Sequence, residues 1–131
     1  MKLFRPTGLK ELELVRDLAW QAWPPRLPDQ PIFYPVLTFE YAEKIARDWN
    51  AVGSPPDNVG FVTEFEISEA LAAKYPVELA GGRDHAELWV PAEELDGFNA
   101  GIIGTIKVVA FYRDKARAPL EEMPASVRQD G

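Results

Sequence analysis

Prolines occupy four of the eight positions between 24 and 31, namely Pro24, Pro25, Pro28 and Pro31. Each proline lacks a backbone amide donor and fixes its own φ angle, so a run of this kind cannot continue a helix or a central strand. The segment therefore divides the chain. We expect it to form a stiff, irregular connection of fixed shape between the elements on either side.

The residues around this segment alternate between extended and helical patterns. Residues 2–5 form an extended segment, and Thr7 is a candidate cap for a helix that ends near Trp20. Residues 32–37, with the sequence IFYPVL, are typical of a strand. Because Pro35 cannot donate a ladder hydrogen bond, it favours a sheet edge or a bulge for this strand.

Thr38 is a candidate N-cap for the helix that follows this strand. The apolar residues of the expected helix recur at helical spacing, with most of the charged residues outside the stripe that they form. They are Ala42, Ile45, Ala46 and Trp49. A strand, a capped turn and an amphipathic helix of this kind can fold as a unit without having any function.

The second half of the chain is richer in strand patterns. Residues 59–67 alternate as a half-buried strand does, and Ser68 is a candidate cap for a short helix after them. Extended segments at 76–80 and 86–91 follow, with a glycine pair between them as the turn. The β-branched run at 102–112 predicts the last strand.

These elements together indicate the fold class. Pro91 suits the first turn of one more helix, which we expect to stop at Gly97. A wholly parallel sheet would need a helical crossover between each pair of strands, and the second half of the chain has too few. We therefore predict an α+β fold with a mixed or antiparallel sheet and two N-terminal helices.

Length and composition indicate one domain. The chain has 131 residues, and we assign residues 1–112 to a single domain. Residues 113–131 are polar, charged and proline-bearing, so we expect a loosely ordered tail with little core burial. Cysteine is absent, and no apolar run approaches the roughly 20 residues of a membrane span or resembles a signal peptide. We expect a cytoplasmic protein without disulfides.

The charge balance limits the partners. Fourteen basic and twenty-one acidic residues give a formal net charge of −7, which repels nucleic acid and anionic membranes. Nucleic acid and membranes are therefore disfavoured as partners, although a local basic pocket can still hold a small anion. His85 is the only histidine, so the usual zinc ligands are missing, and we predict no metal site.

Three residues stand out as candidates for chemistry. Arg5 ends the first strand, where its guanidinium suits a phosphate or a carboxylate, although an ordinary salt bridge is an alternative. Tyr34 in the second strand can stack on a flat ring or can belong to the core. Glu87 shares one face of a strand with His85 and Trp89, and the alternative for it is a glutamate that faces water at a sheet edge.

The order of these residues along the chain resembles the ADP-ribosyltransferase fold. The resemblance consists of an arginine that ends the first strand, an aromatic strand that leads into a helix (IFYPVLTFEYAEKIA), and a late glutamate that opens ELWVPAEEL. In that family, a first-strand arginine or histidine, a second-strand tyrosine or serine and a late glutamate surround NAD. Small bacterial proteins labelled ADP-ribosylation/crystallin are similar over about residues 2–112, but the chain lacks the paired-aspartate metal motifs of the crystallin-like hydrolases.

The resemblance implies roles for particular residues. Arg5 would hold the phosphates of NAD, Tyr34 or Phe33 would wall the nicotinamide, and His85 would also bind the cofactor. Glu87 would be the catalytic residue, because a carboxylate on the ribose hydroxyls stabilises the positive charge that develops when the bond to nicotinamide breaks. The chain departs from the family in having no Ser-Thr-Ser motif on the second strand, no first-strand histidine, and no glutamate or glutamine two positions before Glu87.

Three hypotheses follow from the sequence. The first is an ADP-ribosyltransferase-like protein that binds NAD as its substrate and transfers ADP-ribose or cleaves NAD. The second is a protein of the same fold that only binds a small nucleotide or a protein partner. The third is an interaction protein whose exposed aromatic side chains contact another chain, with Trp20, Trp23 and Trp89 as the candidates.

Overall fold

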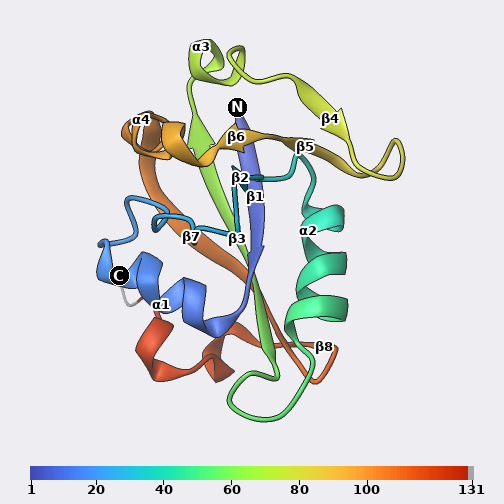
Figure 1. Ribbon diagram of the computed structural model, residues 1–131. Coiled ribbons are helices and arrows are strands. Elements are labelled where there is room, and N and C mark those ends of the chain that lie inside the picture. Colours follow the sequence, from blue (N-terminus) through green and yellow to red (C-terminus); the bar gives the residue numbers. More distant parts are fainter. Residues whose placement is uncertain (130–131) are drawn as a thin grey trace.

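The computed structural model describes residues 1–129 and has an α+β fold built on an antiparallel sheet (Figure 1). The main sheet has the strand order β1-β3-β7-β8. Its strands are Lys2–Thr7 (β1), Val59–Ile67 (β3), Ile102–Arg113 (β7) and Ala116–Ala118 (β8). Each neighbouring pair of these strands is antiparallel, which confirms the predicted fold class.

Helix α2 (Phe39–Ile45) covers one face of this sheet and continues as a π-helical turn (Ala46–Asn50). Thr38 caps it as predicted, because its hydroxyl accepts a hydrogen bond from the backbone N–H of Tyr41 at 3.2 Å. The turn lies very close to β3. A Cβ atom on Gly60 would lie 2.3 Å from the carbonyl oxygen of Ala46, so this approach requires glycine.

The apolar stripe predicted for this helix is only partly right, because the helix ends in a π-helical turn. Ala42 and Ala46 are fully buried, but Trp49 is 75% exposed. The backbone N–H of Ala51 bonds to the carbonyl of Ala46, five residues back. This wider turn breaks the regular 3.6-residue period on which the stripe was predicted, and Trp49 faces outward.

Helix α1 (Leu9–Asp17) packs on the opposite face, against Phe61 and Phe111. The expected cap is wrong, because Thr7 belongs to β1 and Gly8 is the N-cap residue, with no side chain to bond the first turn. The helix also ends earlier than predicted. It stops before two successive residues with positive φ, Ala19 and Trp20.

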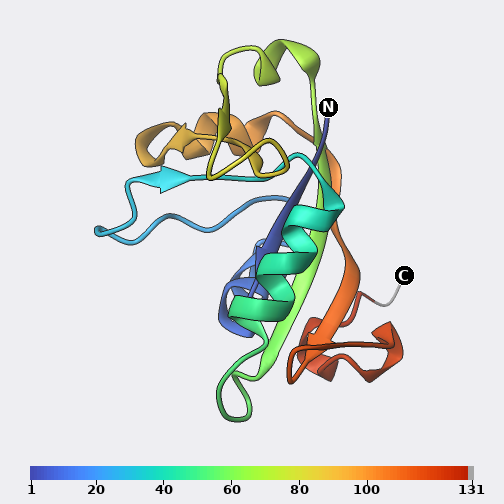
Figure 2. The ribbon, with the colours of Figure 1, turned by 90° about the vertical axis from the view of Figure 1, so that its right-hand side faces the viewer.

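In the described part of the chain, the segment at residues 32–37 pairs with the main sheet only through a single β-bridge at Val36. Val36 forms antiparallel bridges with Phe4 of β1 and with Glu87 of the later strand β5 (Ala86–Leu88). Strand β2 (Ile32–Phe33) instead pairs with β6 (Val90–Pro91) in a separate two-stranded sheet. Figure 2 shows β2 running away from the long axis of β1, so the two chain segments separate beside their shared bridge.

The proline-rich connection is irregular, as predicted, and it is anchored at both ends. At one end, the Asn99 side chain accepts a hydrogen bond from the backbone N–H of Trp23 at 2.8 Å and donates one to its carbonyl at 2.9 Å. At the other end, the N–H of Ala92 donates to the carbonyl of Pro31. These bonds, together with the fixed φ angles of the prolines, hold the connection against the core.

Shorter elements complete the upper part of the molecule in Figure 1. Ser68 caps helix α3 (Glu69–Ala72) as predicted, and β4 (Val77–Leu79) pairs with β5. A 3-10 turn (Ala92–Glu94) leads into α4 (Leu95–Ala100). Gly97 lies inside this helix rather than at its end, so that predicted boundary is wrong.

The segment after β7 is more ordered than we expected. Two 3-10 turns, Leu120–Glu122 and Ala125–Val127, follow β8. Met123 is 4% exposed and Val127 is fully buried against the α1 side of the core, so the predicted low core burial is wrong here. The segment is polar on average, but its few apolar side chains pack into the core, which an average over the composition does not predict. Residues 130–131 of the predicted tail lie outside the described part of the chain.

Within residues 1–129, no helix is long and apolar enough to cross a membrane.

Candidate functional site

Arg5 lies at the point where β1 and the 32–36 segment separate, and it is 6% exposed. Its guanidinium forms two hydrogen bonds with Glu11, from Nε at 2.6 Å and from Nη2 at 3.0 Å. It also lies 4.6 Å from the centroid of the Phe33 ring. The salt-bridge alternative is therefore confirmed for Arg5, with only Nη1 left for a long 3.5 Å contact to the carbonyl of Tyr34.

Arg26, in the proline-rich connection, also lies over Phe33, with 5.9 Å between its Cζ atom and the ring centroid. Among residues 1–129 its guanidinium has no hydrogen bond and no ion pair, and its Nε is buried without a partner. Burial and then the charge of Arg5 lower the pKa of Arg26, while Glu11 and Tyr34 raise it. Because arginine stays protonated, one positive charge here has no carboxylate of its own.

We call these residues, Arg5, Glu11, Arg26 and Phe33, the arginine cluster. Two guanidinium groups and one carboxylate leave it with a net positive charge, in a chain whose overall formal charge is −7. Half-buried charges are screened less than exposed ones. The cluster can therefore attract an anion although the molecule as a whole repels anions.

A second group of residues surrounds Glu87, which is 6% exposed. Its Oε1 accepts a hydrogen bond from Trp89 Nε1 at 2.7 Å, and its Oε2 accepts one from the Tyr41 hydroxyl at 3.0 Å. The ring of Tyr41 stacks on that of His85, with 4.6 Å between centroids and 12° between planes. We call Tyr41, His85, Glu87 and Trp89 the carboxylate cluster.

The carboxylate cluster confirms one prediction and corrects another. His85, Glu87 and Trp89 do share one side of their strand, as period-two alternation predicts. The alternative of a water-facing Glu87 is wrong, because two neutral donors and the packing around them cover it. Burial, followed by the hydrogen bond to Glu87, raises the pKa of Tyr41 to about 12, so this hydroxyl remains a donor at neutral pH.

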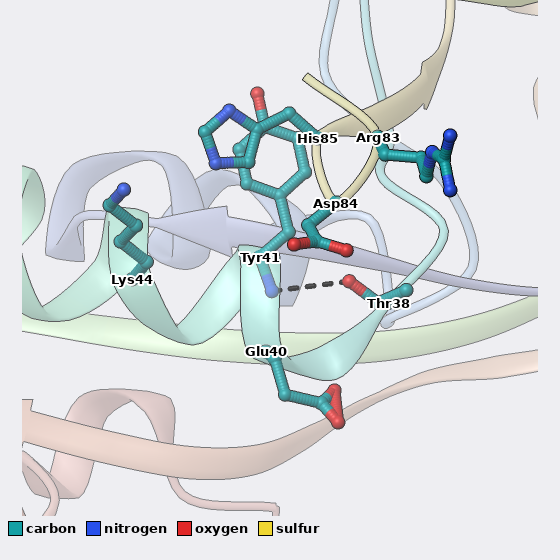
Figure 3. Close-up of a pocket in the computed structure, with 7 residues that line it drawn as sticks. All are labelled: Thr38, Glu40, Tyr41, Lys44, Arg83, Asp84 and His85. Atoms are coloured by element: carbon teal, nitrogen blue, oxygen red, sulfur yellow. Dashed lines mark hydrogen bonds between the residues drawn. The ribbon is translucent and has the colours of Figure 1, made fainter. Parts of the chain in front are cut away.

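An open groove of about 570 Å³ runs past Tyr41 and His85. Figure 3 shows the two stacked rings in the middle of the groove, with Lys44 and Arg83 on opposite sides of them. Glu40 and Asp84 also line it, so its charges are mixed. The groove thus offers an aromatic surface between positive side chains, next to the buried carboxylate.

Tyr34 lies between the two clusters. Its ring centroid is 5.9 Å from Cζ of Arg5, and the side chain is 43% exposed. The register that pairs Phe33 with Val90 and Val36 with Glu87 places Tyr34 opposite Trp89. Side chains that are opposite one another in an antiparallel pair share a face. Tyr34 therefore lies opposite Trp89 of the carboxylate cluster, and it adjoins the arginine cluster through both its ring and its backbone carbonyl.

The structure divides the predicted site residues into two groups. Arg5, Phe33 and Tyr34 come together, and His85 and Glu87 come together. Arg5 and Glu87 are not in contact. Phe4 is bridged to Val36, and Val36 to Glu87, so these three side chains share one face of the sheet, whereas Arg5, the next residue after Phe4, projects from the opposite face.

Two further residues were not predicted from the sequence. Arg26 reaches Phe33 only because the proline-rich connection folds back on the core, and Tyr41 reaches Glu87 only because α2 packs on that face. The sole local signal for Tyr41 was its place three residues after the Thr38 cap. Of the three tryptophans predicted to be exposed, Trp89 is 44% exposed, but Trp23 is 1% exposed and Trp20 packs against the core.

Comparison of the chain with protein-family models, with curated proteins and with solved structures finds no match in any of the three. In the described part of the chain, no group of three or more histidine, aspartate or glutamate side chains is arranged to hold a metal ion. The geometry of the two clusters is therefore the basis for a functional assignment.

Proposed function

We propose that this protein binds NAD or a related nucleotide across Tyr34, with the phosphates on the arginine cluster and a flat ring on the exposed aromatic side chains. The observation that carries the proposal is the unpartnered, half-buried guanidinium of Arg26 beside the Arg5–Glu11 pair. A planar guanidinium presents several donors in a fork that matches phosphate oxygens.

The aromatic side chains support the other half of the ligand. Tyr34 and Trp89 are 43% and 44% exposed, and they lie opposite one another on the face that carries Glu87. Exposed aromatic rings at such a position can stack on a base or a nicotinamide ring. This part of the molecule thus combines a positive site with a stacking surface, the two chemistries that a nucleotide needs.

The strand order also fits the resemblance to ADP-ribosyltransferases. The segments that bear Arg5, Tyr34 and Glu87 lie side by side, because Val36 bridges β1 on one side and β5 on the other. That resemblance implies transfer of ADP-ribose or cleavage of NAD with Glu87 as the catalytic residue. Both oxygens of Glu87 are already bonded to neutral donors and the side chain is nearly covered, so the geometry favours binding over catalysis.

Isothermal titration with NAD tests the proposal. The Arg26→Gln variant removes only the spare charge, and we expect it to weaken NAD binding by roughly tenfold or more, the effect of losing one charge-assisted hydrogen bond. Arg47→Gln is the matched control, because the Arg47 side chain is 41% exposed and, among residues 1–129, it forms an ion pair only with its neighbour Asp48. Absence of saturable heat at millimolar NAD, or equal losses in the two variants, would contradict the proposal.

A further inference from the structure

A second cavity, of about 170 Å³, opens where β1 and the 32–36 segment separate, and it shares Arg5, Glu11 and Tyr34 with the proposed nucleotide site. The end of β1, the start of α1, the side of Tyr34 and Asn50 at the end of the π-helical turn all line it. At roughly 30 Å³ per water molecule, it has room for about five waters or for one small polar molecule.

A buried hydroxyl in the cavity wall lacks a partner. Thr7 is 1% exposed, and within residues 1–129 its Oγ1 has no hydrogen bond. Thr63, on the neighbouring strand, is 0% exposed, but its hydroxyl donates to the carbonyl of Arg5 at 2.8 Å. Because burying a hydroxyl without a hydrogen bond is costly, such groups are normally satisfied. Thr7 is therefore the unsatisfied member of two otherwise similar threonines, and it is one of the residues that line the cavity.

Asn50 supplies a second unused polar group from a different element. Its Oδ1 is buried without a partner, and the described residues provide no acceptor for its amide N–H₂ group either. The π-helical turn and its close approach to Gly60 place this side chain in the cavity wall. Isolated π-helical turns are frequent at functional sites.

The backbone adds an acceptor at the free edge of β1. Phe4 uses both its N–H and its carbonyl to bond Val36. Backbone groups of successive residues point alternately to the two edges of a strand, so those of Pro6 point to the same edge as those of Phe4. Pro6 lines the cavity and has no N–H. A further strand cannot pair fully with this edge, and the carbonyl of Pro6 remains an acceptor for a ligand.

These groups define the chemistry of an occupant. The charges in the wall, Arg5 and Glu11, are paired with each other, which favours an uncharged molecule over an anion. The unused groups both donate and accept, and they come from two elements, β1 for Thr7 and Pro6 and the π-helical turn for Asn50. Hydroxyl groups can donate and accept, and they rotate to suit such a spread of partners.

We infer that this cavity binds a small uncharged polyol, either a free sugar or the sugar of a larger ligand, through Thr7, Asn50 and the carbonyl of Pro6. The inference does not rest on nucleotide binding, because a free sugar is a sufficient probe. Tyr34 lines the cavity as well as the proposed nucleotide site, so a nucleotide could place its ribose here.

Two-dimensional NMR of the whole protein, titrated with D-ribose, tests the inference. We expect saturable shifts in the amide signals of Gly8 and Asn50, and a dissociation constant about fivefold higher in Thr7→Val, the ratio expected for one hydrogen bond. Asn50→Ala should weaken binding likewise. Thr105→Val is the control, because Thr105 is exposed and lies on β7.

The same spectra show whether each variant is folded, so a loss of binding can be separated from a loss of structure. Adenosine distinguishes the two sources of the hydroxyl groups: tighter binding than D-ribose at the same signals indicates the sugar of a nucleoside, and equal or weaker binding indicates a free sugar. Absence of shifts with D-ribose, unchanged affinity in both variants, or tighter binding of acetamide than of D-ribose at the signals of Gly8 and Asn50 would overturn the inference.

Discussion

The arginine cluster and the carboxylate cluster are adjacent, but they differ in how far the protein itself forms hydrogen bonds to their charged groups. In the carboxylate cluster, one buried charge receives a hydrogen bond on each oxygen, from Tyr41 and from Trp89. In the arginine cluster, Glu11 satisfies Arg5 and leaves Arg26 without a partner. A charge that the protein already satisfies contributes to structure, whereas a charge that it leaves unsatisfied is available to a ligand. On this view Glu87 holds the fold together and Arg26 recruits the anion.

The ion pair of Arg5 should show the largest effect on stability. We expect Glu11→Gln to lower the free energy of unfolding by about 3 kcal/mol, because the variant leaves the buried Arg5 charge uncompensated beside Arg26. Glu40→Gln is the matched control, since Glu40 is exposed and also lies in the first turn of a helix. Urea unfolding measures the free energy of unfolding of both variants. Equal losses would mean that Glu11 acts only on the helix dipole.

The carboxylate cluster should show the next largest effect. Glu87→Gln keeps the shape of the side chain but turns an amide N–H₂ toward either Tyr41 or Trp89, which are both donors. We expect a loss of about 2 kcal/mol, typical of hydrogen bonds to a charged group. Glu66→Gln, on an exposed position of β3, is the control. If Glu87→Gln were as stable as this control, Glu87 would not have the structural role that the comparison assigns to it.

The two buried threonines should differ by a smaller amount. Thr63→Val removes the hydrogen bond to the carbonyl of Arg5, so we expect it to cost about 1 kcal/mol. Thr7→Val removes a hydroxyl that has no hydrogen-bond partner among residues 1–129, and it should leave stability unchanged or raise it slightly. Thermal unfolding of the two variants measures the difference. A larger loss for Thr7→Val would show that its hydroxyl is satisfied in the free protein.

The smallest effect concerns the pH dependence of stability. Because the folded pKa of Tyr41 is raised from 10 to about 12, the folded state binds more protons between these values than the unfolded state does. The contribution of Tyr41 is therefore complete below pH 10 and is lost as the pH rises toward 12. We expect Tyr41→Phe, followed by urea unfolding, to flatten this decline. An unchanged slope would mean that Tyr75 and Tyr112, whose pKa values are also raised, account for all of it.

Local signals predicted the parts of the fold that depend on neighbouring residues. The caps at Thr38 and Ser68 and the strand at 59–67 are where the sequence places them. The prediction that Trp49 is buried was wrong, because the helix ends in a π-helical turn, which does not follow the regular helical period. This turn lies where β3 comes very close to the helix, at Gly60. Contacts between distant segments produced these failures, and a pattern within one element does not contain such contacts.

The candidate site shows the same division. Alternation along one strand was enough to group His85, Glu87 and Trp89. The position of Arg26 depends on Asn99, which anchors the proline-rich connection from a helix more than seventy residues later in the chain. No local rule predicts that contact. The sequence therefore directed attention to Arg5, whose charge is paired with Glu11, and not to Arg26, whose guanidinium has no hydrogen bond or ion pair within residues 1–129.

The most direct test of the central claim compares ADP with adenosine on the wild-type protein and on Arg26→Gln. If the spare charge of Arg26 binds phosphate, the wild type should bind ADP more tightly than adenosine, and the variant should lose most of that difference while its affinity for adenosine stays the same. Equal affinities of the wild type for ADP and adenosine, or a variant that still prefers ADP to the same degree, would contradict the account.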